Sequence, residues 1–504
     1  MKALLMHRDR DLDLAAPLPA QAETLRQDLD LRTLAEAMSG GDELLRNIAD
    51  RVLLGGFGID VDTVFYRQEM LKDALAHPQT VRAVHALALE AIERKRKQYF
   101  GFLANYPQAV LRGSAQILEE FIDVIVRLRA LADKEGPLFR SEGYVQFFVM
   151  LRAEFDDDYV ERMRAHLRQV RSDRGVLLSA GLGEANAGTG YVLRLPKAGP
   201  SWLDRLLMRA PPVYTFHIAE RDDAGAQTLT EMQDRGINEV GNALAQSMDH
   251  MLSFFEQVRD EVGFQVAALN LHERLSAIGV RTSFPEPTLA GTRHQRFTGL
   301  VEPCLGLHIG RAPVANDADV EGKSLVIVTG ANQGGKSSFL RSVAIAQLMM
   351  QAGLFVAAEA FSADLCSGVH THYKREEDAT MKSGKLDEEL ARMSAIADSI
   401  APDALLLFNE SFSSTNEREG SELARQITSA MLERHIKVWF VTHQYDFAHG
   451  WYVQRRADTL FLRADREPDG SRSFRLREGE PLATSWGEDL YKEIFGEERV
   501  VAAT

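Results

Sequence analysis

The sequence predicts a mainly α-helical region with a small β-containing insert, followed at the C-terminus by an α/β domain built around a phosphate-binding loop. Three observations lead to this fold class. A glycine-rich loop stands between an apolar strand and a helix near residue 330. Two further apolar, strand-like runs follow it, near residues 405 and 438. Before residue 290, long stretches repeat apolar side chains every three or four positions, which is typical of packed helices.

The glycine-rich loop has the spacing G-x-x-x-x-G-K-S, a pattern that cradles nucleotide phosphates. It consists of Gly330, Ala331, Asn332, Gln333, Gly334, Gly335, Lys336 and Ser337, with Ser338 directly after. An apolar run at 325–328 precedes the loop and a helical repeat follows, so the strand–loop–helix context is present. We expect this loop to bind ATP, with Lys336 reaching the β- and γ-phosphates and Ser337 binding Mg²⁺. A glycine-rich turn without a ligand is the alternative.

Composition excludes several classes of protein. The chain has 504 residues, of which 45% are hydrophobic and 26% charged, as in ordinary globular proteins of several domains. Its net charge of −15 argues against a protein that coats nucleic acid without specificity. Two cysteines, Cys304 and Cys366, form no disulfide framework and favour the reducing cytoplasm. We find neither a signal peptide nor an apolar run long enough to span a membrane.

The pattern predicts three ranges. Residues 1–40 form an N-terminal leader that joins a helix at about 25–38. Residues 41–290 form the helical region, with a β-containing insert at about 174–222, and residues 291–504 form the α/β domain. The prolines Pro285 and Pro287 end the helical region and mark this last boundary.

Within the helical region, apolar spacing predicts long helices over 107–133, 143–171 and 227–278. The third carries a sustained apolar seam, which indicates a helix bundle or a coiled coil. Strand-like runs at 175–180 and 191–195 flank a glycine-rich segment, which favours a β-hairpin over a nucleotide-binding loop because no helix follows. A basic run at 94–97 is either a patch for a phosphate backbone or a solvated helix face.

The second half of the nucleotide site is predicted from two later strands. Residues 403–410, DALLLFNE, are an apolar run that ends in Asn409 and Glu410. In the Walker B pattern an acidic pair ends such a strand. Here Asn409 takes the place of the first acid and supplies no charge to a metal, whereas Glu410 is a candidate general base. We therefore expect Ser337, Asn409 and Glu410 around Mg²⁺. His443 follows the strand at 436–442 and is placed to sense the γ-phosphate.

Three segments together resemble the ATPase domain of the MutS family of DNA mismatch repair proteins, which belongs to the ABC-type ATPases. They are GANQGGKSSFLRSVAIAQLMMQAGLFVAAE, LLLFNESFSSTNEREG and FVTHQYDF, and the resemblance covers about residues 300–490. It implies ATP hydrolysis with Mg²⁺, a homodimer and DNA as partner. It also implies that Thr415 and Asn416 touch the dimer partner's site, that His443 is the switch histidine, and that Glu389 matches a glutamate of the family.

The chain also departs from the family pattern. Asn409 replaces an aspartate, which predicts slow hydrolysis. Gly384, with Ser383 adjacent, stands where the family has a serine that reaches across the dimer, and Arg463 stands where a histidine often stacks on adenine. We find no mismatch-reading N-terminal domain and no wedge of the family's kind, so mismatch recognition itself does not follow.

These observations favour a cytoplasmic, dimeric, MutS-like ATPase that binds structured or mismatched DNA and acts in repair or recombination. One alternative is an ATP-driven conformational switch that binds protein partners rather than DNA. Another is a structural ATP clamp with little turnover.

Overall fold

The computed structural model describes residues 1–97, 107–170, 177–184, 188–194, 215, 217–219, 221–375, 384–467 and 471–483. The chain divides into two compact units. Unit 1 comprises residues 1–3, 82–140 and 144–259, and unit 2 comprises residues 4–81, 141–143 and 260–504. The ranges 1–40, 41–290 and 291–504 remain predictions. None of the described helices combines the length and the apolar composition that a membrane span requires.

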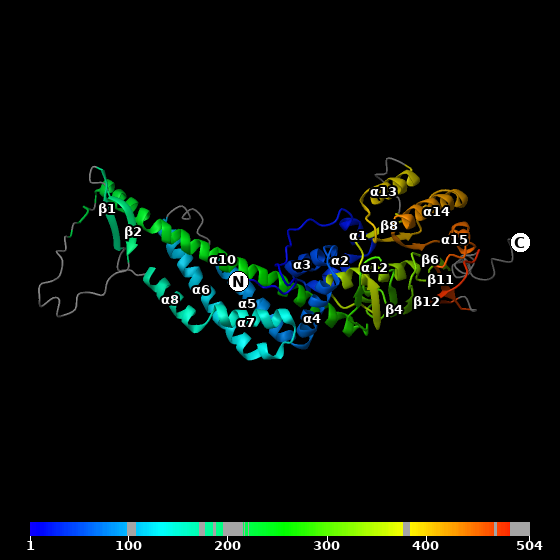
Figure 1. Cartoon of the computed structure of the whole chain (residues 1–504), viewed down its shortest axis with the longest axis horizontal. Coiled ribbons are helices and arrows are strands. Elements are labelled where there is room, and N and C mark those ends of the chain that lie inside the picture. Colours follow the sequence, from blue (N-terminus) through cyan, green and yellow to red (C-terminus); the bar gives the residue numbers. More distant parts are fainter. Residues whose placement is uncertain are drawn as a thin grey trace. The chain divides into compact units, whose positions relative to one another are not determined.

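The described part of unit 1 consists of helices and one hairpin (Figure 1). Its elements are most of α5 (Pro78–Lys97), α6 (Pro107–Glu135), the 3₁₀ turn η2 (Gly136–Leu138), α7 (Glu142–Glu154), α8 (Asp157–Val170), β1 (Leu177–Leu182), β2 (Gly188–Arg194) and the first part of α10 (Asp223–Ala277). Aromatic rings join three of the helices: Phe121 of α6 lies 5.2 Å from Phe255 of α10, and Phe147 of α7 lies 6.5 Å from Phe254. These ring pairs form part of the core of unit 1.

The seam predicted for 227–278 is confirmed as one continuous helix, α10, of 55 residues. Its apolar side chains Met251, Phe255 and Val258 are buried. The predicted hairpin is also confirmed, since β1 and β2 pair in antiparallel register from Leu177 opposite Arg194. Its tip, at 185–187, lies outside the described residues.

The single helix predicted for 143–171 is wrong, because the structure has two helices, α7 and α8. Asp156 separates them, and its side chain accepts a hydrogen bond from the backbone N–H of Tyr159 at 2.7 Å. The guanidinium of Arg129 donates to the backbone carbonyl of Phe155 at 2.7 Å. These two bonds satisfy backbone groups that a continuous helix would pair internally, and they stabilise the break. Because the break is short, the apolar spacing continues across it.

The basic run at 94–97 lies at the end of α5, where its cations pair with acids. Arg94 contacts Glu90 at 2.6 Å, Lys95 lies 3.8 Å from Asp249, and Glu93 lies 3.0 Å from Arg96 and 3.8 Å from Lys97. These pairs favour the reading of a solvated helix face, since each cation already has a carboxylate neighbour.

Unit 2 is mixed α/β, and its main sheet has six strands in the order β12-β11-β6-β10-β9-β8. These are β12 (Arg472–Glu478), β11 (Thr459–Arg466), β6 (Leu325–Gly330), β10 (Lys437–Val441), β9 (Leu405–Asn409) and β8 (Val369–Tyr373). All neighbours are parallel except β12, which runs antiparallel to β11. A second sheet is formed by β3 (Glu286–Thr288), β7 (Ala360–Asp364), β4 (Gln295–Leu300) and β5 (Asn316–Asp319).

Helices cover both faces of the main sheet. On one face α13 (Lys385–Ser399), α14 (Glu417–Glu433) and α15 (Tyr445–Tyr452) contribute Met393, Met431 and Trp451 to a core that also contains side chains of β6, β9 and β10. On the other face lies α12 (Lys336–Ala352), where Phe339 packs 5.8 Å from Trp439 of β10. Parallel strands buried on both faces explain the continuous apolar runs of the sequence.

Residues 4–81 add helices to unit 2. They include α1 (Ala22–Asp28), α2 (Leu31–Ser39), α3 (Glu43–Leu54) and α4 (Val61–Ala76). Helix α11 (Pro303–Ile309), from later in the chain, contacts α2. The single helix predicted at 25–38 is therefore wrong. Asp30 has a left-handed backbone, with φ of 54°, and this turn separates α1 from α2.

A buried carboxylate fixes the segment that precedes α1. Glu261 of α10 is fully buried, and its two oxygens accept the backbone N–H groups of Leu5 and Leu12. Arg67, also buried, donates from Nε to the carbonyl of Met6 at 3.0 Å. Burial raises the pKa of Glu261 to about 7, with the backbone hydrogen bonds opposing that shift.

This carboxylate makes folding stability depend on pH. Because its pKa is higher in the folded than in the unfolded chain, protonated Glu261 stabilises the fold fully below its ordinary pKa of 4.5, and this stabilisation is lost as the pH rises through about 7. We expect the free energy of unfolding of the wild type, minus that of Glu261→Gln, to fall from about pH 5 to about pH 8. Chemical denaturation at several pH values measures this difference. A difference that stays constant with pH would contradict the assignment.

Candidate functional site

Three neighbouring parallel strands bring the predicted site residues to one edge of the main sheet. Strand β6 ends in Gly330, β9 ends in Asn409, and β10 ends two residues before His443. In the strand register Val441 pairs with both Val328 and Asn409, so β9 and β10 end level and β6 continues two residues further, to Gly330. The carboxyl ends of parallel strands are where ligands bind in open α/β sheets.

The glycine-rich loop wraps around the start of α12. Gly330 has φ of 109°, and a Cβ there would lie 2.8 Å from the backbone N and O of Ala464 on β11, so only glycine fits. Lys336 opens the helix, and its Nζ donates to the carbonyls of Gly330 and Ala331, both at 3.0 Å. Burial lowers the pKa of Lys336, while Glu410 acts in the opposite direction. A buried ammonium beside a helix N-terminus suits a phosphate.

The loop borders a cavity of about 690 Å³. Asn332, Gln333, Gly334, Gly335, Lys336, Ser337 and Ser338 line it together with Glu410. Of the loop residues, Gly330 and Ala331 do not line the cavity, and Ala331 is buried. A cavity of this size matches the pockets that hold nucleotide-sized ligands.

Ser337 and Asn409 form the oxygen pair expected around Mg²⁺. The hydroxyl of Ser337 donates to the amide oxygen of Asn409 at 2.9 Å. Hydroxyl and amide oxygens suit a hard cation, so both residues fit the ion, although the amide adds no negative charge. Ser337 and Glu410 line the cavity and Asn409 does not, and Glu410 is the acidic group of the predicted set.

Glu410 and His443 are in direct contact. The carboxylate of Glu410 accepts the backbone N–H of His443 at 3.2 Å and also bonds to the ring Nδ1. This side-chain hydrogen bond raises the pKa of His443, against the effect of burial. His443 does not line the cavity, so its role as a γ-phosphate sensor stays a prediction.

Thr415 and Asn416 cap a helix. Asn416 precedes α14, and its side-chain oxygen accepts the backbone N–H of Glu419 at 3.0 Å. The hydroxyl of Thr415 donates to the carboxylate of the same Glu419. This arrangement resembles a capping box, and neither residue lines the cavity. Their contact with a second copy of the chain remains a prediction, and Ser383 lies outside the described residues.

The far wall of the cavity was not predicted. It is built from Ile309, Arg311, Pro313, Val314 and Phe474, which carry no motif. Asn316 ties the phenylalanine to this wall, since its Nδ2 donates to the Phe474 carbonyl at 3.2 Å and its Oδ1 accepts the Leu476 N–H at 2.8 Å. Arg463, which stands where the family often has a histidine that stacks on adenine, donates to the Glu480 carbonyl at 3.3 Å and does not line the cavity. Phe339 and Phe474 both line the cavity, and of these two rings that of Phe474 is the exposed one that a base could reach.

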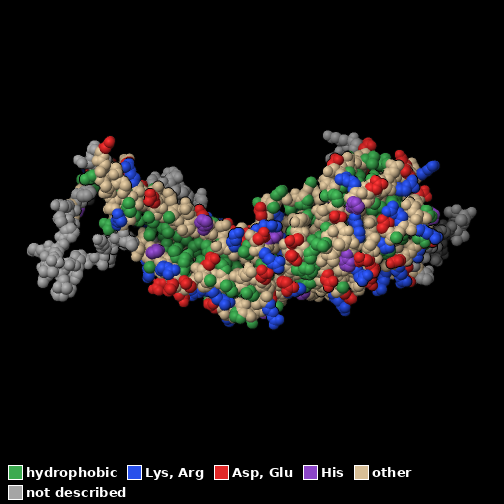
Figure 2. Space-filling view, viewed as in Figure 1, with side chains coloured by type: hydrophobic (Ala, Val, Ile, Leu, Met, Phe, Trp, Pro, Cys, Tyr) green, Lys and Arg blue, Asp and Glu red, His purple; other side chains and the backbone are tan. Residues whose placement is uncertain are grey.

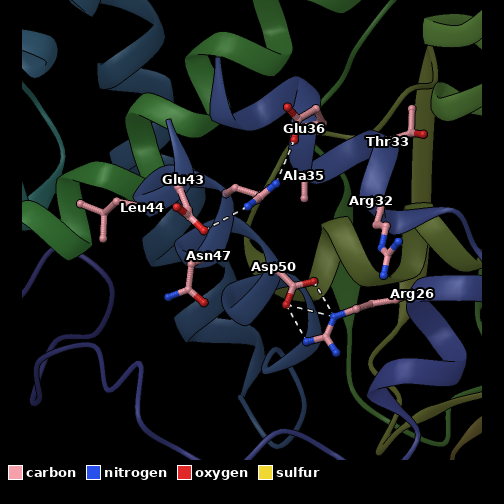
Figure 3. Close-up of a pocket in the computed structure, with 10 residues that line it drawn as sticks. Arg26, Arg32, Thr33, Ala35, Glu36, Glu43, Leu44, Asn47 and Asp50 are labelled. Atoms are coloured by element: carbon pink, nitrogen blue, oxygen red, sulfur yellow. Dashed lines mark hydrogen bonds and ion pairs between the residues drawn. The ribbon is translucent and has the colours of Figure 1, made fainter. Parts of the chain in front are cut away.

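A second, more open hollow lies between α2 and α3 (Figure 3). Arg26 and Arg46 point toward acidic side chains of the wall, whereas Arg32 has no dashed contact with the other residues drawn. Arg26 binds Asp50 at 2.6 Å, and Arg46 lies 3.4 Å from Glu43 and 3.6 Å from Glu36. Because these charges pair within the wall, the hollow offers no converging set of groups for a ligand, in contrast to the cavity beside the glycine-rich loop.

Comparison with known families gives two matches along the chain. The MutS2 N-terminal domain matches residues 59–278, and MutS domain V matches residues 326–487. The second match begins on β6 and contains the glycine-rich loop, Asn409, Glu410 and His443. Together the two matches cover both the helical region and the site described above.

Individual relatives are similar over much of the chain. A DNA mismatch repair protein MutS of Thermus thermophilus is 25% identical over 75% of the chain and 46% of the relative. One of Halalkalibacterium halodurans is 25% identical over 99% of the chain and 62% of the relative, and one of Thermus aquaticus is 28% identical over 65% and 40%. The chain therefore spans about half the length of several of these relatives.

Proposed function

Because this chain belongs to the MutS family, we propose that it binds ATP with Mg²⁺ at the cavity beside residues 330–338 and hydrolyses the nucleotide. The fold that would carry this activity is the ABC-type ATPase domain. The observation that carries the proposal is the meeting of Lys336, Ser337 and Glu410 around one cavity, at the carboxyl edge of a parallel sheet.

Each group has a chemical role in this proposal. Lys336 and the backbone N–H groups of the loop hold the phosphates. Ser337 and Asn409 hold the metal, which would supply positive charge against the phosphate oxygens. Glu410 accepts a proton from the attacking water, and the hydrogen bond from His443 orients that carboxylate.

DNA is the proposed partner. Two relatives that match 75% and 99% of the chain are named as DNA mismatch repair proteins. We therefore propose that the chain acts as a homodimer, binds structured or mismatched DNA in repair or recombination, and changes its grip with the nucleotide state. Ligand-driven change requires different contacts in the two states, so affinity for DNA should differ with and without ATP.

One set of observations favours a second candidate, an ATP-driven switch that binds protein partners. The net charge is −15, and each cation of the run 94–97 has an acidic neighbour. On the face shown in Figure 2, basic and acidic side chains of the described residues are interspersed rather than gathered by sign. Such a surface gives little attraction to a phosphate backbone.

Binding to labelled duplex, mismatched and branched DNA, with and without ATP and at two salt concentrations, tests the proposal. We expect affinity that depends on nucleotide and falls steeply with salt, because phosphate contacts release counterions. Absence of binding to every DNA, with ATP still bound and hydrolysed, would leave the protein-partner candidate in its place.

Asn409 gives a prediction about rate. An Asn409→Asp variant restores a carboxylate next to Ser337 and adds negative charge to the metal site. We expect steady-state phosphate release to rise several-fold at saturating Mg²⁺, with the Mg²⁺ concentration for half-maximal rate shifted downward. An unchanged rate and an unchanged Mg²⁺ dependence would contradict the account of this position.

A further inference from the structure

The backbone that follows Glu410 adopts an unusual conformation. Glu410 and Phe412 both have left-handed φ angles, of 55° and 59°. Residues other than glycine rarely adopt this backbone conformation, so the surrounding structure must hold the backbone there. The residues that hold it therefore help to determine where the Glu410 carboxylate points.

One of these residues is Glu389 of α13, which is 4% exposed. Its Oε2 accepts the backbone N–H of Phe412 at 2.9 Å, and its Oε1 accepts the hydroxyl of Ser414 at 3.1 Å. Both oxygens of this buried carboxylate are thus bonded to the loop that begins at Glu410.

His372 of β8 joins the same loop from the neighbouring strand. Its Nε2 lies 3.0 Å from the Glu389 carbonyl, and its Nδ1 lies 2.8 Å from the hydroxyl of Ser411. Burial lowers the pKa of His372 to about 4, so the ring is neutral and carries one proton. A carbonyl can only accept, so that proton sits on Nε2. The Ser411 hydroxyl lies within hydrogen-bond distance of both Nδ1 and the backbone carbonyl of His372, so its one proton faces two acceptors of the same residue.

The loop is also enclosed by neighbouring side chains and backbone. The ring of His372 stacks on that of Phe412, with centroids 5.2 Å apart and planes at 16°. On the other side, Gln444 donates to the Phe412 carbonyl at 3.0 Å, and a Cβ at Gly420 would lie 2.2 Å from that carbonyl. Residues 410–414 therefore have little room to adopt another conformation.

We propose that Glu389, supported by His372, is a positioning residue that holds residues 410–414 so that the Glu410 carboxylate faces the nucleotide cavity. The proposal rests on the proposed ATP hydrolysis. Glu389 does not line the cavity and does not touch the substrate. Its removal should therefore lower the rate of the chemical step and leave ATP binding nearly unchanged.

A pair of variants tests the positioning. Glu389→Ala removes both hydrogen bonds and should lower kcat about 10- to 100-fold, since small misplacements of a reacting group cost this much. The ATP concentration for half-maximal rate should stay within about two-fold. Glu389→Gln should retain most of kcat, because its amide oxygen can accept the Phe412 N–H and its amide nitrogen can donate to the Ser414 hydroxyl.

Glu388→Ala is the matched control. This neighbouring glutamate of α13 lies 3.7 Å from Arg392 and makes no recorded contact with residues 410–414 in the described structure. Its kcat should equal that of the wild type. If Glu389→Ala does not fold, Ser414→Ala, which removes one of the two bonds, should still lower kcat with unchanged nucleotide affinity.

Hydrogen exchange separates this inference from the proposed function. Peptides that cover 410–416 should exchange faster in Glu389→Ala than in the wild type without nucleotide, because the Phe412 amide loses its acceptor. If the wild-type protein does not hydrolyse ATP, the proposed function is overturned. If hydrogen exchange of the 410–416 peptides is the same in Glu389→Ala and the wild type, the positioning contacts are overturned, whether or not the protein hydrolyses ATP. Wild-type kcat in Glu389→Ala, with hydrolysis by the wild type intact, would overturn the positioning role alone.

Discussion

A Glu410→Gln variant should bind ATP nearly as tightly as the wild type and hydrolyse it about 10²- to 10⁴-fold more slowly, the range that a positioned general base contributes. Glutamine has the same shape, and its oxygen can accept the backbone N–H of His443 that Glu410 accepts now. The variant therefore keeps the geometry and loses only the group that takes the proton.

Single-turnover phosphate release measures the chemical step, and a fluorescent ATP analogue measures binding. Glu433→Gln, at an exposed glutamate that ends α14, should behave as the wild type. Hydrolysis by Glu410→Gln at the wild-type rate would show that another group activates the water. A parallel loss of binding would instead show that the carboxylate acts mainly through the metal.

Lys336→Ala should weaken ATP binding about 10- to 100-fold, because hydrogen bonds to a charged group contribute about 1.5–3 kcal/mol each. The ammonium lies inside the loop and now donates to the carbonyls of Gly330 and Ala331. In the complex we expect it to turn to the phosphates, so its loss removes the one side-chain cation of the loop itself.

Titration with ATP, followed by calorimetry, gives the dissociation constant. Lys323→Ala is the control, since this half-buried lysine precedes β6 and donates to the Ala457 carbonyl, at the opposite end of the strand from the loop. Circular dichroism should confirm that both variants are folded. Equal affinity in Lys336→Ala and Lys323→Ala would contradict the phosphate-binding role of the loop.

Regular periodicity predicted the elements whose side chains repeat over many residues. The seam of α10 and the apolar strands β6, β9 and β10 were located correctly, because burial on a constant face leaves a constant spacing. The breaks at Asp30 and Asp156 were missed, since a turn of one or two residues hardly disturbs that spacing. An acid followed by polar residues, as at Asp156, was the available signal for the second break.

The site was predictable where a motif fixes backbone and chemistry together, as in the glycine-rich loop. The far wall of the cavity was not, because Val314 and Phe474 come from segments 160 residues apart that only the fold brings together. The same holds for Glu389 and Phe412, whose contact depends on how α13 packs against the sheet. Apolar and polar side chains of this kind look ordinary until the tertiary structure places them.

The strand register described for β6, β10 and β9 also limits how this chain can change during evolution. Asn409 pairs with Val441, and Val441 with Val328, so Glu410 and the glycine-rich loop share a fixed register. Deleting one residue within β9 would draw Glu410 back by about 3.3 Å and turn its side chain to the opposite face of the sheet. Insertions and deletions that preserve activity should therefore fall in the connections that lead into the amino ends of the parallel strands. Their length can vary there without moving the reacting groups.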